Sequence, residues 1–283
     1  MELLEPEAFA ALTEPDCIRI QQALAAQVEE RDCLSAVRTV AGVDLAYWQE
    51  EAHEAAVCCI VVLDAETRAV VEEQFCAGEV RFPYIPGCFA FRELPLLLRA
   101  AERLTVRPDV FLFDGNGILH PRGLGLASHA SFYLDAPTAG VAKRYFQLDG
   151  ASCGPLEDRA GAWADITREG RVLGRALRTR AGTKPVYISV GNRICLETAA
   201  ELALRLTGPP GAGGVGDHRF QLRIPLQDAG TEGVLAGAAL AHQTEDAAHE
   251  GAPGRRKASI SSRGAWTEPW TKSGLPPPRP RRA

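Results

Sequence analysis

The sequence predicts one mixed α/β domain over roughly residues 15–206, followed by a disordered basic tail. Three observations support this organisation. Apolar runs of strand length alternate with stretches in which apolar residues recur at helical spacing. The run VRPDVFLFDG (106–115) is apolar almost throughout, which is typical of a strand at the centre of a sheet. Beyond residue 206 the periodicity ends, and Gly, Ala, Pro and Arg become frequent.

The first part of the chain predicts a helix and then a meander of strands. Residues 6–31 read as a helix with apolar residues spaced along one face. The runs 37–47, 56–65 and 69–80 have the composition of strands. A short acidic turn separates the last two, so we expect antiparallel pairing.

The second part of the chain alternates helical and strand patterns. Its predicted elements are, in order, helix 87–104, strand 106–115, helix 127–135, strand 137–143, strands 171–179 and 184–191 as a hairpin, and helix 195–206. The segment TGPPGAGGVG (207–216) has the composition of a flexible linker.

Charge is distributed unevenly along the chain. The net charge of the 283 residues is −5. Residues 251–283 contain eight Lys or Arg and one acid, a net charge of +7, which leaves −12 on the preceding residues. An acidic body argues against a protein that coats nucleic acid, but it allows a local binding groove and suits a bound divalent cation.

Neither a membrane span nor a secretory signal is expected. The longest apolar run, AAVCCIVVL (55–63), is too short to cross a bilayer, and the N-terminus MELLEPEAFA has early acids and no basic start. The eight cysteines include no Cys-x-x-Cys pair and lie mostly in apolar segments, which indicates core residues in a reducing compartment. We therefore expect a cytoplasmic protein, or a nuclear or nucleolar one in a eukaryotic cell.

Three acids stand in unusual places. Asp44 lies within the strand of VAGVDLAYW, Glu93 on the helix of FAFRELP, and Asp114 at the end of VFLFDG. A buried acid is costly unless it is paired or holds a metal, although any one of these could lie at a strand end or cap a turn. If the three converge, hard oxygen ligands favour Mg²⁺, with Mn²⁺ as a substitute. Such a cluster typically performs metal-assisted displacement at phosphorus.

The glycine-rich loop GNGILHPRGLG (115–125) follows Asp114. It matches neither a P-loop nor a dinucleotide fingerprint, and its glycines would let the backbone approach a bulky ligand. His120 and, further on, His129 are either structural histidines or contacts to phosphate. Arg122 is either a solvated loop charge or a phosphate ligand.

The segment PYIPG (83–87) places two prolines around Tyr84 and Ile85 just before the helix of Glu93. Prolines stiffen such a loop. The loop either packs its aromatic residue inward or projects an apolar wedge that inserts between stacked bases. Lys143, in GVAK, follows a short apolar strand, and in the simplest interpretation it is a solvated strand end.

Five motifs together resemble the endonuclease V family in order and spacing, over about residues 37–206. They are VAGVDLAYW, PYIPGCFAFRELP, PDVFLFDGNGILHPRGLGLASH, PTAGVAK and YISVGNRICLETA. The resemblance implies a ribonuclease-H-like fold, a mixed five-stranded sheet flanked by helices. It also implies Mg²⁺-dependent hydrolysis of the second phosphodiester on the 3′ side of a deaminated base, which leaves 3′-hydroxyl and 5′-phosphate ends. Members of the family act on deoxyinosine in DNA, and several also cut inosine-containing RNA.

The resemblance assigns roles to single residues. Asp44, Glu93 and Asp114 match the metal-binding acids, and Lys143 matches the lysine at the scissile phosphate, so these four are the predicted catalytic residues. Tyr84 matches the wedge tyrosine, and backbone near three glycines would form the pocket for a flipped-out hypoxanthine. The predicted substrate-binding residues are Pro83, Tyr84, Ile85, Pro86, Gly87, Gly115, Gly117, His120, Arg122 and His129.

The chain departs from the family pattern in two places. Asn192 in SVGNR stands where many members carry histidine. Asparagine can accept a hydrogen bond or ligate a metal through its carbonyl oxygen, but it cannot transfer a proton as imidazole does. The segment LRIPLQDAG (222–230) keeps the arginine and first proline of a family segment and lacks its Glu-Pro.

We assign residues 1–227 to the nuclease domain and 228–283 to the low-complexity tail. The expected partner is inosine-containing DNA, single- or double-stranded, or inosine-containing RNA, bound by a monomer. Two alternatives remain at this point: a ribonuclease-H-like nuclease that recognises strand structure, and an inosine-binding protein with weak or no catalysis.

Overall fold

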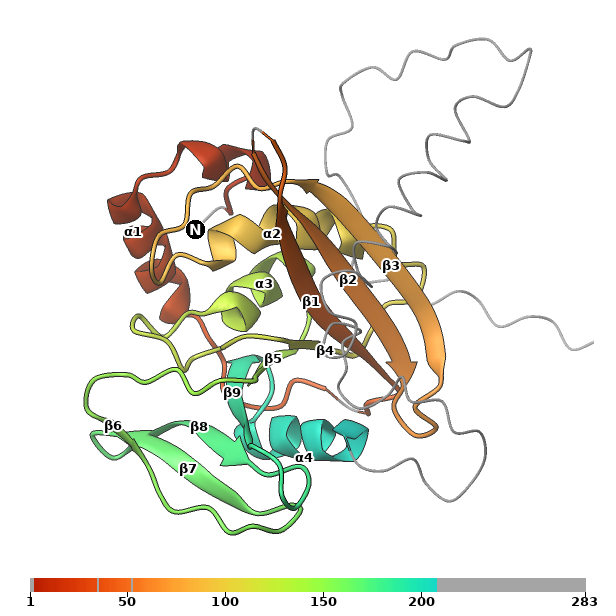
Figure 1. The fold of residues 1–283 in the computed structure, drawn as a ribbon, viewed down its shortest axis with the longest axis vertical. Coiled ribbons are helices and arrows are strands. Elements are labelled where there is room, and N and C mark those ends of the chain that lie inside the picture. Colours follow the sequence, from red (N-terminus) through yellow and green to blue (C-terminus); the bar gives the residue numbers. More distant parts are fainter. Residues whose placement is uncertain (1–2, 35, 52, 208–283) are drawn as a thin grey trace, which may run out of the picture. The chain divides into compact units, whose positions relative to one another are not determined.

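The computed structural model describes residues 3–34, 36–51 and 53–207. Within them, nine strands form one sheet in the order β3-β2-β1-β4-β5-β9-β8-β7-β6 (Figure 1). The strands are β1 Thr39–Gln49, β2 Glu54–Asp64, β3 Val70–Glu79, β4 Val110–Phe113, β5 Thr138–Ala142, β6 Ala151–Cys153, β7 Trp163–Arg168, β8 Arg171–Leu177 and β9 Val186–Asn192. The helices are the 3₁₀ helix η1 Pro6–Ala11, α1 Glu14–Ala25, α2 Ala90–Ala101, α3 Leu126–Leu134 and α4 Leu196–Thr207. The linker from residue 208 onward, the tail and their predicted boundary lie outside the described residues.

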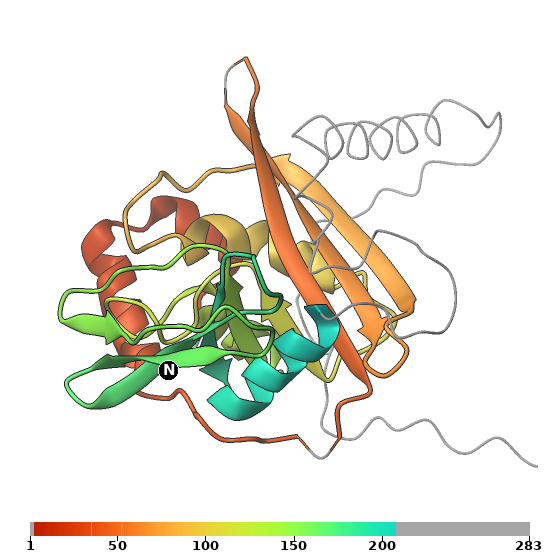
Figure 2. The same ribbon diagram turned by 60° about the horizontal axis from the view of Figure 1, so that its bottom comes forward.

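The first three strands form the predicted antiparallel meander. β2 pairs antiparallel with both β1 and β3, and the β1–β2 hairpin extends beyond the rest of the sheet (Figure 2). β4 then pairs parallel with β1, and β5 pairs parallel with β4. The sheet is therefore mixed, as the sequence predicts.

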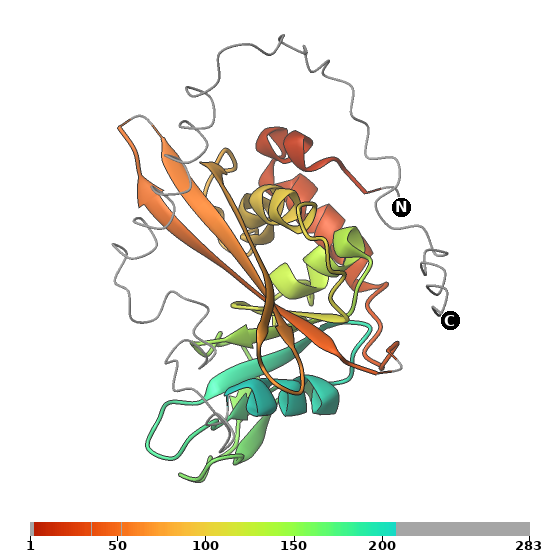
Figure 3. The same cartoon turned by 90° about the vertical axis from the view of Figure 1, so that its right-hand side faces the viewer.

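The central strand β4 is buried on both faces, which explains its continuous apolar run. Phe111 and Phe113 point to a core shared with α1, α2 and α3. Val110 and Leu112 alternate with them and point to a second core, which α4 closes. Figures 1 and 3 show α2 and α3 on one side of the sheet and α4 near β9 and β8.

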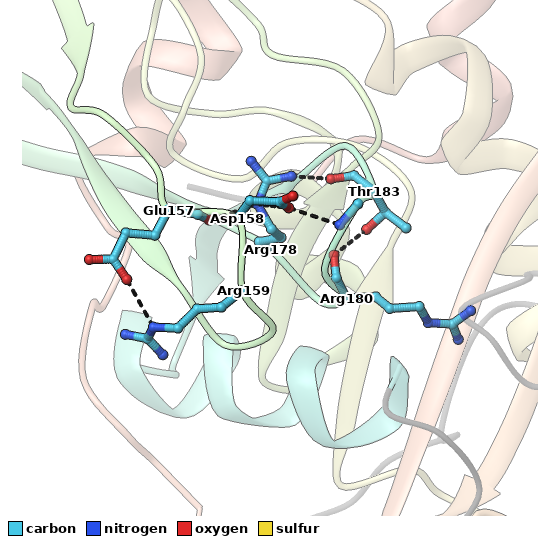
Figure 4. Close-up of polar contacts among 7 residues, drawn as sticks. Glu157, Asp158, Arg159, Arg178, Arg180 and Thr183 are labelled. Atoms are coloured by element: carbon cyan, nitrogen blue, oxygen red, sulfur yellow. Dashed lines mark hydrogen bonds and ion pairs between the residues drawn. The ribbon is translucent and has the colours of Figure 1, made fainter.

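The other half of the sheet is antiparallel. β8 and β9 pair as the predicted hairpin, and β7 and β6 continue the sheet beyond them. The resemblance implied a five-stranded sheet, whereas the sheet of the described residues has nine strands. Seven of these were predicted individually from the sequence, and β6 and β7 were not. At this end of the sheet the β6–β7 and β8–β9 loops are joined by hydrogen bonds around Arg178, which donates to the Glu157 and Thr183 carbonyls (Figure 4).

The predicted helix 6–31 is in fact two helices. The chain breaks at Thr13, whose hydroxyl and backbone N–H both donate to the Asp16 carboxylate, a hydrogen-bonding pattern that starts a new helix. Pro15, in the first turn of α1, cannot continue a preceding helix. α1 therefore begins at Glu14 and ends at Ala25.

The cysteines lie mostly in the core, as the sequence indicates. All eight cysteines are free thiols, and five of them are buried. Among the described residues, no helix combines the length and apolar character that crossing a membrane requires.

Candidate active site

Strand register brings two of the three predicted acids together. β1 and β4 run parallel with Val43 opposite Phe113, so the next residues of the two strands are Asp44 and Asp114. The Asp114 N–H donates to the Val43 carbonyl at 3.0 Å, which extends this pairing to the end of β4. Asp44 is buried, with 8% of its surface exposed. Two carboxylates thus lie side by side at the edge of the apolar core.

Lys143 joins this pair from the neighbouring strand. β5 pairs parallel with β4 and ends at Ala142, immediately before the lysine. The Lys143 ammonium lies 2.6 Å from Asp114 Oδ2 and 3.3 Å from Asp44 Oδ2. One cation is therefore shared by two carboxylates.

The pKa values of these groups follow from their surroundings. Burial raises the pKa of Asp44 to about 6, and repulsion from Asp114 adds to the rise while Lys143 opposes it. Burial alone would lower the pKa of Lys143, but the hydrogen bond to Asp114 and the charge of Asp44 raise it. The lysine is thus held in its charged form.

Glu93 approaches from the first turn of α2 and is buried. Burial raises its pKa to about 8; the Tyr47 hydrogen bond acts in the opposite direction, and repulsion from Asp44 and Asp114 adds to the rise. The Tyr47 hydroxyl donates to Glu93 Oε1 at 2.8 Å. Tyr47 was not singled out in the sequence, although it lies three residues after Asp44 in the same motif.

The donor set fits a hard divalent cation. Three carboxylates act on one another electrostatically in a buried setting, and two of them already converge on a positive charge. Oxygen ligands of this kind suit Mg²⁺ and Mn²⁺. In the arrangement of residues 3–34, 36–51 and 53–207, however, no three Asp, Glu, His or Cys side chains are gathered closely enough to form a complete cation site.

The loop 83–87 projects from the protein. Tyr84 is 69% exposed, and Pro83 and Pro86 are exposed beside it. Phe82 and Cys88, which flank the loop, are buried. The alternative in which the aromatic residue packs inward does not describe this structure.

The arginine next to Glu93 supports the first end of this loop. Arg92 is buried and donates to the Phe82 carbonyl at 2.7 Å. It also pairs with Glu54 at 2.5 Å, and its guanidinium lies 6.0 Å from the centre of the Tyr84 ring. This role had no signal in the sequence, because an arginine on a helix normally reads as a solvated charge.

His120 and Arg122 contact the other end of the loop. His120 Nε2 lies 3.0 Å from the Gly87 carbonyl oxygen, and Arg122 Nη2 lies 2.6 Å from it. Arg122 is therefore not the solvated loop charge of the simplest interpretation, and the contact of His120 agrees with its structural alternative.

The glycines after Asp114 differ in what they do. A Cβ on Gly117 would lie 1.8 Å from the Val190 carbonyl oxygen, so this glycine lets the loop pack directly on β9. The Gly117 N–H donates to Ser189 Oγ at 2.8 Å. A Cβ on Gly115 would meet only ordinary contacts, the nearest at 3.7 Å. Backbone approach at Gly117 is thus explained by packing within the protein.

His129 lies in the core. It is 0% exposed, and its ring packs edge-on against Phe91 at 4.9 Å and near Phe9 and Tyr133. Burial lowers its pKa to about 3. The buried ring cannot reach a substrate in this structure, contrary to the predicted role. His129 is instead a structural histidine, which was the alternative interpretation.

Asn192 also has a structural role. It is buried at the end of β9, and its Oδ1 accepts a hydrogen bond from the Glu29 N–H at 2.7 Å. That oxygen is committed to the backbone ahead of β1. Among the described residues, the hydrogen bond seen for this asparagine is to backbone and not to the carboxylates described above.

Comparison with known proteins identifies the family. The sequence model of the Endonuclease V family matches residues 22–210. Endonuclease V of Bacillus velezensis is 43% identical over 233 residues, which cover 82% of this chain and 95% of the relative. Endonuclease V of Bacillus subtilis is 41% identical over 208 residues, covering 73% of this chain and 87% of the relative.

Solved structures show the same likeness. A crystal structure of the Bacillus subtilis endonuclease V is similar with a TM-score of 0.72 and 37% identity, covering 86% of this chain and 100% of the other. A Ciona intestinalis endonuclease V, solved with a 23mer DNA containing an inosine followed by a ribo-adenosine, is similar with a TM-score of 0.61 and 28% identity, covering 70% and 92%. The sheet with its flanking helices is thus of the ribonuclease-H-like type that the sequence resemblance implied.

Proposed function

The chain belongs to the endonuclease V family, and from that premise we propose that it hydrolyses the second phosphodiester 3′ to an inosine, with Mg²⁺ as its cofactor. Membership makes the protein an endonuclease that acts in nucleic-acid repair and, with its family, a metal-dependent one. The position of the cut, the choice of metal and the roles of single residues are our proposals.

The observation that carries the proposal is the register of β1 and β4. It places Asp44 beside Asp114, and Lys143 then approaches both from β5. A protein seldom buries two adjacent carboxylates unless a cation is to bind there. Only the third acid, Glu93, comes from a helix.

Asp44, Asp114 and Glu93 would hold the divalent cation. When bound, this cation supplies a Lewis acid that makes water more acidic and offsets the negative charge that develops at phosphorus. Tyr47 orients Glu93 through its hydroxyl hydrogen bond. Burial, and then repulsion between the acids, disfavours their ionised forms in the metal-free site, and a bound cation would offset both effects.

Lys143 is the cationic partner of the reacting phosphate in this proposal. Its ammonium is charged and already lies beside the acids that would hold the metal. An ammonium at this position stabilises charge on a phosphate oxygen without needing to give up its proton.

The projecting loop selects the base. Tyr84 is exposed and flanked by two prolines, so its ring can enter the base stack at little entropic cost. Insertion at this point favours extrusion of the target base, which is required before the base can be recognised. Backbone groups at Gly87 lie next to the wedge and are suited to contact the extruded base.

The direct test uses 5′-labelled strands that carry one inosine or one adenosine, as DNA and as RNA, with Mg²⁺, with Mn²⁺ or with EDTA. We expect a metal-dependent cut at the second phosphodiester 3′ to inosine and none in the adenosine strand. The faster of the two inosine strands identifies the natural substrate. Equal cleavage of inosine and adenosine strands would refute the proposed specificity.

We also propose that the protein acts inside the cell as a monomer. Its eight cysteines are free, and several of them lie in the core, which suits a reducing compartment. Sedimentation at micromolar concentration would test the monomer.

A further inference from the structure

The Gly87 carbonyl oxygen is contacted by three side chains from two distant segments. Gln21 Nε2, on α1, donates to it at 2.8 Å. Arg122 Nη2 donates at 2.6 Å, and His120 Nε2 lies at 3.0 Å. A carbonyl oxygen has two lone pairs, so three partners on one oxygen fix the orientation of this peptide unusually firmly.

The three side chains also fix one another. Gln21 Oε1 accepts from Arg122 Nε at 2.6 Å, and the Arg122 N–H donates to His120 Nδ1 at 3.2 Å. Because Nδ1 is the acceptor, the imidazole proton is on Nε2 and points at Gly87. Burial, and then the charge of Arg122, lower the pKa of His120 to about 4, which keeps this tautomer neutral.

Gly87 itself is held in a conformation that suits glycine. Its φ is +77°, and a Cβ there would lie 2.6 Å from Arg122 Nη2. The Gly87 peptide, at the end of the loop 83–87, is therefore fixed by its own backbone conformation and by side chains of α1 and of the loop after β4.

We propose that Gln21 is a positioning residue for base recognition, which holds the Gly87 peptide in the orientation that the extruded base meets. The inference rests on the proposed function, because it assumes that Gly87 lies at the base pocket. Gln21 is 1% exposed, and it lies one residue before the segment that matches the family model. Its contacts are to Gly87, Leu124 and Arg122.

The same geometry gives Arg122 a different role from the one expected. Its Nε and Nη2 atoms are engaged by Gln21 and Gly87, so we expect it to act within the protein and not as a phosphate ligand. This difference is measurable, because each phosphate contact that is lost reduces the slope of log Kd against log salt concentration by about one unit.

The experiment measures binding by the full chain in EDTA, where no cleavage occurs, with fluorescent inosine and adenosine strands. Gln21→Met removes the donor to Gly87 at similar volume. We expect Kd for the inosine strand to rise about tenfold, because the Gly87 carbonyl loses one of its three partners and the peptide loses its fixed orientation, and Kd for the adenosine strand to stay unchanged. Gln22→Met is the matched control: this neighbour on α1 is exposed, and both Kd values should equal those of the wild type.

Gln21→Glu provides a second variant that keeps the acceptor for Arg122. Ionised beside Arg122, its carboxylate cannot donate to Gly87, so we expect the same loss of inosine preference in a folded protein. The Mg²⁺ concentration that gives half-maximal cleavage should be unchanged in both variants, because the acids are untouched. Arg122→Leu should lose inosine preference with an unchanged salt slope.

Undiminished inosine preference in folded Gln21→Met or Gln21→Glu would overturn the inference, as would a salt slope reduced by about one unit in Arg122→Leu. These outcomes are separate from failure of the proposed function. In that case the wild-type protein itself would bind and cleave inosine and adenosine strands alike.

Discussion

The ammonium of Lys143 is the only side-chain cation seen bonded to both Asp44 and Asp114 within the described residues. If it offsets their repulsion, Lys143→Met should lower the melting temperature of the metal-free protein at pH 8 and enlarge the stabilisation that Mg²⁺ provides. Mg²⁺ at 100 times its Kd should stabilise the folded protein by about 2.7 kcal/mol. Thermal unfolding in EDTA and in Mg²⁺ measures both effects.

Lys184→Met is the control, because this lysine is exposed and far along the chain from the acids. Its melting temperature should respond to Mg²⁺ as the wild type does. An identical Mg²⁺ response in Lys143→Met and Lys184→Met would contradict the shared role of Lys143.

His129 makes a second residue-scale prediction. Its pKa is about 3 in the folded protein and about 6.5 when exposed. Because the folded value is lower, the stability that the neutral ring provides is complete above pH 6.5 and is lost as pH falls toward 3. Between pH 6.5 and 5 the loss is about 2 kcal/mol.

His129→Phe should therefore flatten the acid limb of the stability curve, measured by urea unfolding between pH 7 and 5. The phenyl ring suits the surrounding aromatic cluster. His120, whose pKa burial also lowers, keeps part of the acid dependence, so the slope should become shallower and not vanish. A variant whose stability falls with acid as steeply as that of the wild type would show that His129 is not buried as a neutral ring.

At the scale of elements, the loop after β4 packs on β9 through Gly117. Gly117→Ala would place a methyl group on the Val190 carbonyl, so we expect a loss of stability of about 2 kcal/mol or more. Gly115→Ala is the matched control, since its methyl group meets only ordinary contacts. Urea unfolding compares the two, and equal stabilities would contradict the close packing.

The projecting loop 83–87 provides a second prediction at this scale. Tyr84 is largely exposed, so Tyr84→Ala should leave the melting temperature unchanged. Loss of stacking on a base costs roughly 1–3 kcal/mol, so binding of inosine strands should weaken about tenfold or more. Unchanged affinity for inosine strands, measured in EDTA, would mean that the ring does not enter the stack.

At the scale of the whole molecule, the sequence predicted the meander, the central strand and three of the four α-helices within a few residues. It could not show that Asp44 and Asp114 are adjacent, because that depends on the parallel register of β1 with β4. β6 escaped prediction because it has only three residues, and β7 because its largest apolar residue, Trp163, is exposed while Ala164 and Ile166 are the buried ones. Tertiary contacts, and not local pattern, decide such strands.

The candidate site, like the fold, could be predicted from the sequence only in part. The acids, Lys143 and the loop 83–87 were recognisable from their motifs, and the structure brings Asp44, Asp114 and Lys143 together and leaves Tyr84 exposed. The residues that hold the loop were not recognisable. Gln21 and Arg92 are polar residues on helices, and only long-range packing makes them internal. Whether His129 was structural was equally undecidable, since burial is a property of the assembled core.

The central claim is that Asp44 and Asp114 form the catalytic metal site. It is tested most directly by single-turnover cleavage of the inosine strand with Asp114→Asn and with Asp149→Asn, which alters an exposed acid in a turn. We predict that Asp114→Asn cuts at least 1,000-fold more slowly, on the order of the rate lost when a catalytic group is removed, with its fold and its binding of inosine strands retained. Asp149→Asn should cut at the wild-type rate. Cleavage by Asp114→Asn within tenfold of the wild type would contradict the account.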